Sequence, residues 1–427
     1  MKNKILLFLC LIFMIMLLLL NSYFCGDNIN ENIYQKYEKS MLSMMLEQNS
    51  GAGDYLQVVQ SNWPTEGYIF NKERSGCENG GELSWDDTRK TVVMMGNTSD
   101  KCYVYFDIWF PSIADYCNNK DYLASCVKAF GNAGSDISNI YIHNSSLANG
   151  AGDNSYRYAG ASDKVNNFVC FGSTETPCPN DNLYRIIGVI DGKVKLIKYD
   201  YANSNLLGTD GDFSGGLYIH KNYYRGKQTN INSYSWNYKA DTTINDSTGS
   251  NTWSTSLLNK TNLNTNFLNN LGTFWTNKIA TTTWKVGGNT FANMVNVVPS
   301  VAYQNEIINP DTANSTDNAI TYNAKVGLMY ISEYGFAASP SAWTTNLYNY
   351  NNSTSIINSS WIHMGLIEWT NTRNTSSKYE TYCIDYTGNL PSGKASYGMG
   401  IRPSFNLESF VTYKSGKGTE SDPIIIN

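Results

Sequence analysis

The pattern of apolar and polar residues divides the chain into an apolar start, a short helical segment and a long region of strands. Residues 5–20 are continuously apolar, a length that fits a signal peptide and nearly spans a bilayer. Residues 29–47 contain no Pro or Gly and carry apolar residues at helical spacing, which predicts a helical stalk over 27–50. From 51 to 112, short β-branched and aromatic runs lie between turn residues, which predicts a small β-rich module.

The pattern beyond this module predicts a mixed domain. Residues 113–135 have a helical pattern, so we expect a helical connector over 113–152. The run LYRIIGVIDGKVKLIK at 183–198 predicts a hairpin, because Asp-Gly at 191–192 is a strong turn signal between two apolar arms. The sequence then predicts an α+β domain over residues 153–427.

A helix is expected between residues 254 and 281. Apolar residues recur there every four positions, from Leu263 to Ile279, and this spacing forms one face of a helix. Gly272 is expected to divide the helix in two. Trp275 lies on the apolar face, so we interpret it as a core residue.

We expect residues 1–26 to form a signal anchor or a signal peptide, and this segment indicates the compartment of the rest of the chain. Lys2 and Lys4 precede the apolar run, so the positive-inside rule places the remaining chain outside the cell. No clean pair of small residues for signal peptidase follows the run, which favours a retained anchor. Phe24 is too bulky for the residue before a lipid-modified Cys25. We expect the extracellular face of the cell envelope, with the protein anchored in the membrane through this segment or secreted.

The cysteines suit an oxidising compartment. Of nine cysteines, Cys10 and Cys25 belong to the N-terminal segment, which leaves seven and therefore an unpaired one. The short separations favour three local bridges with Cys383 left free, although other connectivities remain open. The expected pairs are Cys77–Cys102, Cys117–Cys126 and Cys170–Cys178. No Cys-x-x-Cys occurs and the chain has only 3 His residues, so we expect no metal site.

The composition excludes two classes of protein. Charged residues make up 16% of the chain and the net charge is −5, which does not provide the basic surface that nucleic-acid binding needs. Aromatic residues reach 13%, whereas disordered chains are poor in them. We therefore expect a folded protein that does not bind nucleic acid.

Four strings between residues 153 and 427 resemble a group of uncharacterised surface proteins of low-GC Gram-positive bacteria. They are YRIIGVIDGKVKLIK (184–198), WSTSLLNKTNLNTNFLNNL (253–271), KVGLMYISEYGFA (325–337) and GIRPSFNLESFVTYKSGKGTESDPIII (400–426). Trp369 and the Gly-Ile-Arg-Pro sequence at 400–403 are similar to the end of the C-type-lectin-like fold of formylglycine-generating enzymes and of the variable proteins of diversity-generating retroelements. The resemblance implies a C-type-lectin-like domain over 153–427, whose last strands carry a binding surface.

The enzyme branch of this resemblance is disfavoured. Formylglycine-generating enzymes hold copper with a pair of nearby cysteines, whereas Cys383 is the only cysteine after Cys178. Glu333 and Glu368 are isolated carboxylates in the sequence, and no nucleophile can be matched to His363. We expect no catalytic residues, no cofactor and no enzymatic activity, with an enzyme on a lectin-like scaffold as the second alternative.

The retroelement branch implies a recognition surface over residues 361–396. Tyr and Trp provide rigid contact area, and Asn provides adaptable hydrogen bonds. The competing interpretation makes the Trp residues part of core strands. The candidate ligand-binding residues are Trp361, Trp369, Asn371, Arg373, Asn374, Tyr379 and Tyr382.

The function expected from these features is binding at the cell surface, as in an adhesin or receptor, with an extracellular protein or carbohydrate as the ligand. The first alternative is a pilin-like or envelope-scaffold subunit, in which anchor and stalk helices pack against copies of themselves.

Overall fold

The chain divides into two compact units, with the boundary between Phe110 and Pro111. We refer to them as the first and the second unit. The structure is a computed structural model. It describes residues 41–49, 52–59, 62–64, 67–96, 100–216, 221–238, 249–311, 321–351 and 355–427. The predicted anchor over 1–26 and the first part of the predicted stalk lie outside these residues. Within the described ranges, no helix has both the length and the apolar character needed to cross a membrane.

The first unit is built from strands. A five-stranded sheet has the order β2-β1-β7-β3, with β4 also pairing β7, and β5 and β6 form a separate hairpin. Strands occur in the regions where the sequence predicts them after residue 51. The bounds are β1 (Met41–Glu47), β2 (Tyr55–Val58), β3 (Tyr68–Phe70), β4 (Gly76–Cys77), β5 (Glu82–Asp86), β6 (Thr91–Met95) and β7 (Lys101–Ile108).

Strand β1 corrects the helical stalk predicted over 27–50. Its residues pair in parallel with β7 and antiparallel with β2, so residues 41–47 are a central strand of the sheet. Met44 and Leu46 are buried beside Val104 and Phe106 of β7. Alternate apolar residues suit a strand, and in this short segment they also match helical spacing. Pairing on both sides therefore decides the conformation.

The expected bridge Cys77–Cys102 is present and joins neighbouring strands. The two cysteines are register partners of β4 and β7, and Cys102 is buried in the core of the first unit. The bridge fixes the short edge strand β4 to the sheet.

The second unit contains a seven-stranded sheet in the order β17-β22-β12-β11-β9-β8, with β10 also pairing β11. A four-stranded sheet has the order β15-β18-β19-β20, and β14 pairs β16 in a two-stranded ribbon. The bounds of these strands are β8 (Ile140–Ile142), β9 (Tyr156–Tyr158), β10 (Phe168–Cys170), β11 (Leu183–Ile190), β12 (Lys193–Lys198), β14 (Thr282–Lys285), β15 (Gly288–Asn289), β16 (Thr321–Ala324), β17 (Val326–Gly327), β18 (Glu368–Asn374), β19 (Glu380–Ile384), β20 (Ser392–Lys394) and β22 (Ser404–Asn406). Short pairs complete the unit: β13 (Tyr234–Ser235) with β21 (Gly398–Met399), and β23 (Tyr413–Ser415) with β24 (Ile425–Ile426).

The predicted hairpin at 183–198 is confirmed as β11 and β12. Asp191 and Gly192 both adopt positive φ, 54° and 76°, as a tight turn between twisted strands requires. Val189 and Leu196 are buried in the largest core, so the hairpin forms the middle of the sheet.

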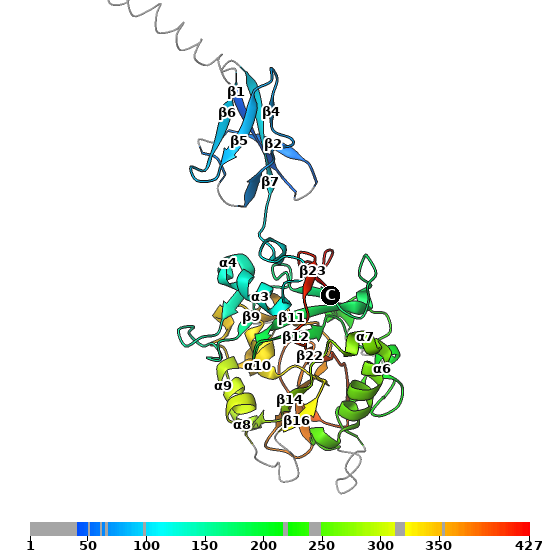
Figure 1. The fold of residues 1–427 in the computed structure, drawn as a ribbon. Helices are drawn as coiled ribbons and strands as arrows, with labels where there is room; N and C mark the ends of the chain where they lie inside the picture. Colours follow the sequence, from blue (N-terminus) through cyan, green and yellow to red (C-terminus); the bar gives the residue numbers. More distant parts are fainter. Residues whose placement is uncertain are drawn as a thin grey trace, which may run out of the picture. The chain divides into compact units, whose positions relative to one another are not determined.

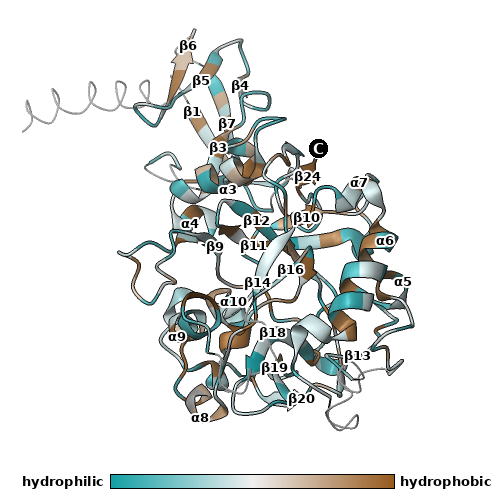
Figure 2. Ribbon diagram, turned by 60° about the horizontal axis from the view of Figure 1, so that its bottom comes forward, coloured by the Kyte–Doolittle hydropathy of each residue, from teal (hydrophilic) through white to brown (hydrophobic). Residues whose placement is uncertain are grey.

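Helices flank the central strands on both sides, with α6 and α7 on one side and α8, α9 and α10 on the other (Figure 1). Their bounds are α3 (Leu123–Asn132), α4 (Ser135–Ser138), α5 (Ser204–Leu207), α6 (Leu268–Leu271), α7 (Thr273–Thr276), α8 (Phe291–Met294), α9 (Pro299–Tyr303) and α10 (Ile331–Phe336). Figure 2 shows hydrophobic and hydrophilic residues mixed along the strands, with β14 mostly of intermediate hydropathy.

The helix predicted between 254 and 281 is present, with one unexpected feature. It begins as a π-helix over Leu258–Phe267, continues as α6 and is divided from α7 at Gly272, which has φ 78°. Trp275 is buried in the core, as predicted.

The predicted connector over 113–152 is part of the second unit rather than a separate segment. Helix α3 buries Leu123, Val127 and Phe130 in the same core as the β11–β12 hairpin. The expected bridges Cys117–Cys126 and Cys170–Cys178 are also present, and Cys383 is a buried free thiol. The compact unit therefore begins at Pro111, before the start predicted at 153.

Candidate functional site

The recognition surface expected over 361–396 is mostly core, which corrects the sequence interpretation. Six of the seven candidate residues are at most 2% exposed. Tyr379 alone among the candidates reaches the surface, with 39% of its area exposed. The buried six are Trp361, Trp369, Asn371, Arg373, Asn374 and Tyr382.

The two tryptophans are anchors of the core. The indole N–H of Trp361 donates to the Tyr158 carbonyl at 2.9 Å, and that of Trp369 donates to the Tyr234 carbonyl at 3.0 Å. A buried indole needs such an acceptor, because its N–H otherwise loses its hydrogen bond to water. Both residues therefore belong to the core, but only Trp369 lies in a strand, β18, as the competing interpretation expects, whereas Trp361 lies in a turn.

Other buried candidates form hydrogen bonds with neighbouring segments of the second unit. Asn374 donates to a Glu380 carboxylate oxygen at 2.9 Å, and the Tyr382 hydroxyl donates to the Asn289 carbonyl at 3.1 Å. Burial lowers the pKa of Arg373 to about 10, while the charge of Asp311 acts in the opposite direction. These side chains are committed to contacts inside the unit.

A pocket of about 350 Å³ lies elsewhere in the second unit, and we call it the Lys195 pocket. Its walls come from the β11–β12 hairpin, the β14 ribbon strand, the helical segment 303–307 and the start of α10. Its lining residues are Arg157, Ile190, Asp191, Lys193, Lys195, Thr281, Thr282, Thr283, Trp284, Lys285, Tyr303, Ile307, Tyr330, Ser332, Glu333 and Asn406.

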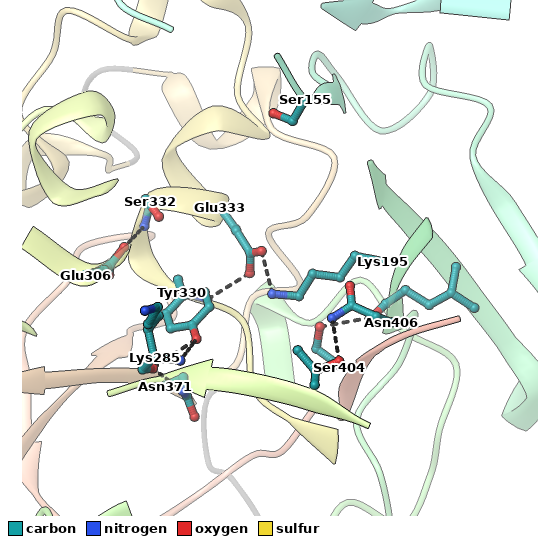
Figure 3. Close-up of polar contacts among 12 residues, drawn as sticks. Ser155, Lys195, Lys285, Glu306, Tyr330, Ser332, Glu333, Asn371, Ser404 and Asn406 are labelled. Carbon is teal, nitrogen blue, oxygen red and sulfur yellow. Dashed lines mark hydrogen bonds and ion pairs between the residues drawn. The ribbon is translucent and has the colours of Figure 1, made fainter. Parts of the chain in front are cut away.

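A buried ion pair is a central feature of this pocket. Lys195 Nζ lies 2.5 Å from Glu333 Oε1, and their side chains are only 5% and 4% exposed. Figure 3 shows the Lys195 side chain extending from its strand toward Glu333, with Tyr330 below the pair. Burial lowers the pKa of Lys195, and the Glu333 carboxylate acts against that shift.

Two aromatic rings surround the lysine ammonium group. Lys195 Nζ lies 4.9 Å from the ring centre of Trp284 and 4.7 Å from that of Tyr330. The electron-rich ring faces attract the cation. The Tyr330 hydroxyl donates to the Lys285 carbonyl at 2.9 Å, so β14 holds this ring in place.

The start of helix α10 holds Glu333, the other partner of the ion pair, in place. Glu333 Oε2 accepts a hydrogen bond from the backbone N–H of Tyr330 at 3.0 Å, which caps the helix. The neighbouring Glu306 carboxylate accepts from the backbone N–H group of Ser332 at 3.3 Å (Figure 3) and from that of Ile331 at 3.2 Å. Burial raises the pKa of Glu306 to about 7.

A second ion pair supports the pocket wall. Arg157 Nη2 lies 2.8 Å from Asp153 Oδ2, and the Tyr303 hydroxyl donates to the same oxygen at 2.8 Å. Burial raises the pKa of the Asp153 carboxyl, but the charge of Arg157 and several hydrogen bonds outweigh this effect and hold the pKa well below its usual range. Asp153 therefore stays ionised, and Arg157 keeps a partner.

The sequence did not identify Lys195, and it presented Glu333 as an isolated carboxylate. The partners are 138 positions apart in the chain, so no local spacing connects them. One signal was present, because Lys195 lies inside an apolar hairpin arm, where a buried ammonium group requires a carboxylate partner. Glu368 is likewise paired, with Arg402.

His363 does not serve as a base on the surface. It is 2% exposed, and burial lowers its pKa to about 3. Two groups of Cys and Asp side chains among the described residues are close enough to hold a metal ion. In both groups the cysteines are joined as disulfides, which offer no thiolate ligand.

Comparison with known proteins gives no relative: no protein-family model, no curated protein and no solved structure matches this chain. The resemblance to C-type-lectin-like surface proteins therefore stays a prediction, and the pocket itself is the basis for a functional proposal.

Proposed function

We propose that the protein is a ligand-binding protein of the cell surface and that it binds a small polar ligand in the Lys195 pocket. The observation that carries the proposal is the buried Lys195–Glu333 pair beside an open cavity. Removing two charges from water costs several kcal/mol per ion, so a packed apolar core would serve stability at least as well. A buried ion pair that lies beside a cavity in spite of this cost suits the recognition of a ligand in that cavity.

The lining supports binding of a polar molecule. Thr282 and Asn406 provide a hydroxyl and an amide, which are hydrogen-bonded to each other at 3.1 Å. The Trp284 and Tyr330 rings are largely buried and pack against the Lys195 ammonium group. Binding pockets combine apolar surface with a few convergent polar groups and occupy about 300–1,000 Å³, a range that includes this pocket. The surface location rests on the apolar N-terminal run and on three disulfides, which persist in oxidising compartments.

An array of glycans and short peptides, probed with the full-length protein in detergent, tests this proposal. We expect a ligand whose binding is lost in Thr281→Trp, because Thr281 is an exposed residue of the pocket wall and the indole would fill the mouth. Thr344→Trp is the matched control, since Thr344 is exposed but does not line the pocket. Absence of any ligand, or equal binding by Thr281→Trp and the wild type, would overturn the proposal.

A further inference from the structure

Cationic side chains line one wall of the Lys195 pocket at two depths. Lys193 and Lys195 are two positions apart in β12, so their side chains leave the same face of the strand. Lys195 is buried, whereas Lys193 is partly exposed, and both line the pocket. A ligand entering the pocket would meet the ammonium group of Lys193 before that of Lys195.

The charge of the lining differs from that of the whole chain. Four cationic residues and two anionic residues line the pocket, although the net charge of the protein is −5. Arg157 is neutralised by Asp153 and Lys195 by Glu333. Lys193 and Lys285 then face one remaining carboxylate, that of Asp191, so the balance stays positive.

Lys195 also keeps hydrogen-bonding capacity. An ammonium group has three N–H donors. Within the described part of the chain, the hydrogen bond of Lys195 Nζ to Glu333 Oε1 is the one that the structure shows for this group. The remaining donors are available to an acceptor in the pocket.

We infer that the ligand is a sugar that carries a carboxylate, a uronic acid in its simplest form. This inference deepens the proposed function and rests on it. The carboxylate pairs with Lys193, and the hydroxyl groups bond to Thr282, Asn406 and the donors of Lys195 that Glu333 leaves unused. A cavity of about 350 Å³ lies near the lower end of ligand pockets and suits one or two sugar rings.

Calorimetric titration of the full-length protein with glucuronate, glucose and acetate tests the inference. We expect glucuronate to bind at least about tenfold more tightly than glucose or acetate, because the carboxylate and the hydroxyl groups are both recognised. Raising NaCl from about 50 to about 500 mM should weaken glucuronate binding and leave glucose binding unchanged, since salt screens partly exposed charges.

Variants of Lys193 separate charge recognition from shape. Lys193→Gln should weaken glucuronate binding by about tenfold without changing glucose binding, and Lys193→Arg should restore most of it. Lys164→Gln is the control, because the Lys164 side chain is 74% exposed and does not line the pocket.

The outcomes distinguish the inference from the proposed function. If glucose binds as tightly as glucuronate, or if Lys193→Gln leaves glucuronate binding intact, the acidic-sugar inference is wrong while ligand binding stands. If acetate alone binds as tightly as glucuronate, the pocket recognises carboxylates without the sugar, and the inference is again overturned. If all three fail to bind, the inference is rejected, and the array decides the proposed function independently.

Discussion

Arg402 and Glu368 form a two-pronged ion pair inside the second unit. Nε of Arg402 lies 2.6 Å from Oε2 of Glu368, and Nη2 lies 2.8 Å from Oε1. Both side chains are at most 2% exposed. The same Nη2 also donates to the Ile362 carbonyl at 2.7 Å, so one guanidinium group links β18 and the closing Gly-Ile-Arg-Pro segment to the chain before them.

Removing one partner of this pair should destabilise the second unit strongly. Arg402→Leu leaves the Glu368 carboxylate buried without its partner, and we expect a loss of about 3–5 kcal/mol in the free energy of unfolding. Urea unfolding measures this change. The double variant Glu368→Leu/Arg402→Leu should recover a large part of the loss, because no unpaired charge remains. A single variant as stable as the wild type would contradict the prediction.

Variants of the Lys195–Glu333 pair should separate its contribution to stability from its contribution to ligand binding. Lys195→Met leaves Glu333 buried without its cation and should cost about 3–5 kcal/mol. Lys195→Met/Glu333→Leu should recover most of this loss, apart from about 0.5–2 kcal/mol for the cap that Glu333 provides to α10. We expect the double variant to fold and to lose ligand binding. Thermal unfolding and the glycan array measure the two properties. A double variant that binds normally would show that the pair only supports the fold.

Acid should destabilise the protein through His363. Burial lowers its folded pKa from 6.5 to about 3, with the charges of Arg225 and Arg402 acting in the same direction. Between these two values the imidazole of His363 binds a proton in the unfolded chain but not in the folded chain. The free energy of unfolding therefore decreases as the pH falls from about 6.5 to about 3. At pH 4.5 the protonation of His363 in the unfolded chain lowers the free energy of unfolding by about 3 kcal/mol.

The variant His363→Gln isolates this contribution, because it keeps a neutral hydrogen-bonding side chain. Its free energy of unfolding should fall less steeply below pH 6.5 than that of the wild type, by about 1.4 kcal/mol per pH unit. Glu306 has the opposite effect between pH 7 and 4.5, since its folded pKa is raised, but it is present in both proteins and cancels in the comparison. Parallel pH profiles for the two proteins would contradict the assignment to His363.

Loss of the Cys77–Cys102 bridge should affect the first unit alone. The bridge spans 25 positions, and the chain-entropy model assigns about 3 kcal/mol to a loop of this size. In Cys77→Ala/Cys102→Ala, amide exchange in β7 should accelerate while exchange in the β11–β12 hairpin stays unchanged. Cys117→Ala/Cys126→Ala is the matched control, because that bridge belongs to the second unit.

Local signals in the sequence predicted local structure well. The Asp191-Gly192 turn, the division at Gly272 and the three cysteine pairs depend on residues that are close in the chain, and the structure confirms each of them. The spacing of apolar residues over 41–47 predicts a helix, because one of the two strand partners of this segment, β7, follows about 60 positions later and leaves no local signal. Tertiary pairing overrode the local pattern there.

The candidate site was misplaced for a chemical reason. Tyr, Trp and Asn side chains suit recognition loops, but the same groups also satisfy backbone polar atoms in irregular cores. Asn251 illustrates this use, because its amide donates to the carbonyls of Asn374, Ser377 and Glu380. A binding surface and a core of long connections therefore have similar compositions, and only the three-dimensional contacts distinguish them.

The position of β22 has a consequence for synthesis. This strand lies between β12 and β17, and the Ser404 hydroxyl donates to the Leu196 carbonyl at 2.9 Å across 208 positions of sequence. At about 5–20 residues per second, the ribosome delivers β22 roughly 10–40 s after β12. During that interval the edge of β12 that later pairs with β22 has no partner from β22, so we expect chaperones to bind the nascent chain until its last strands emerge.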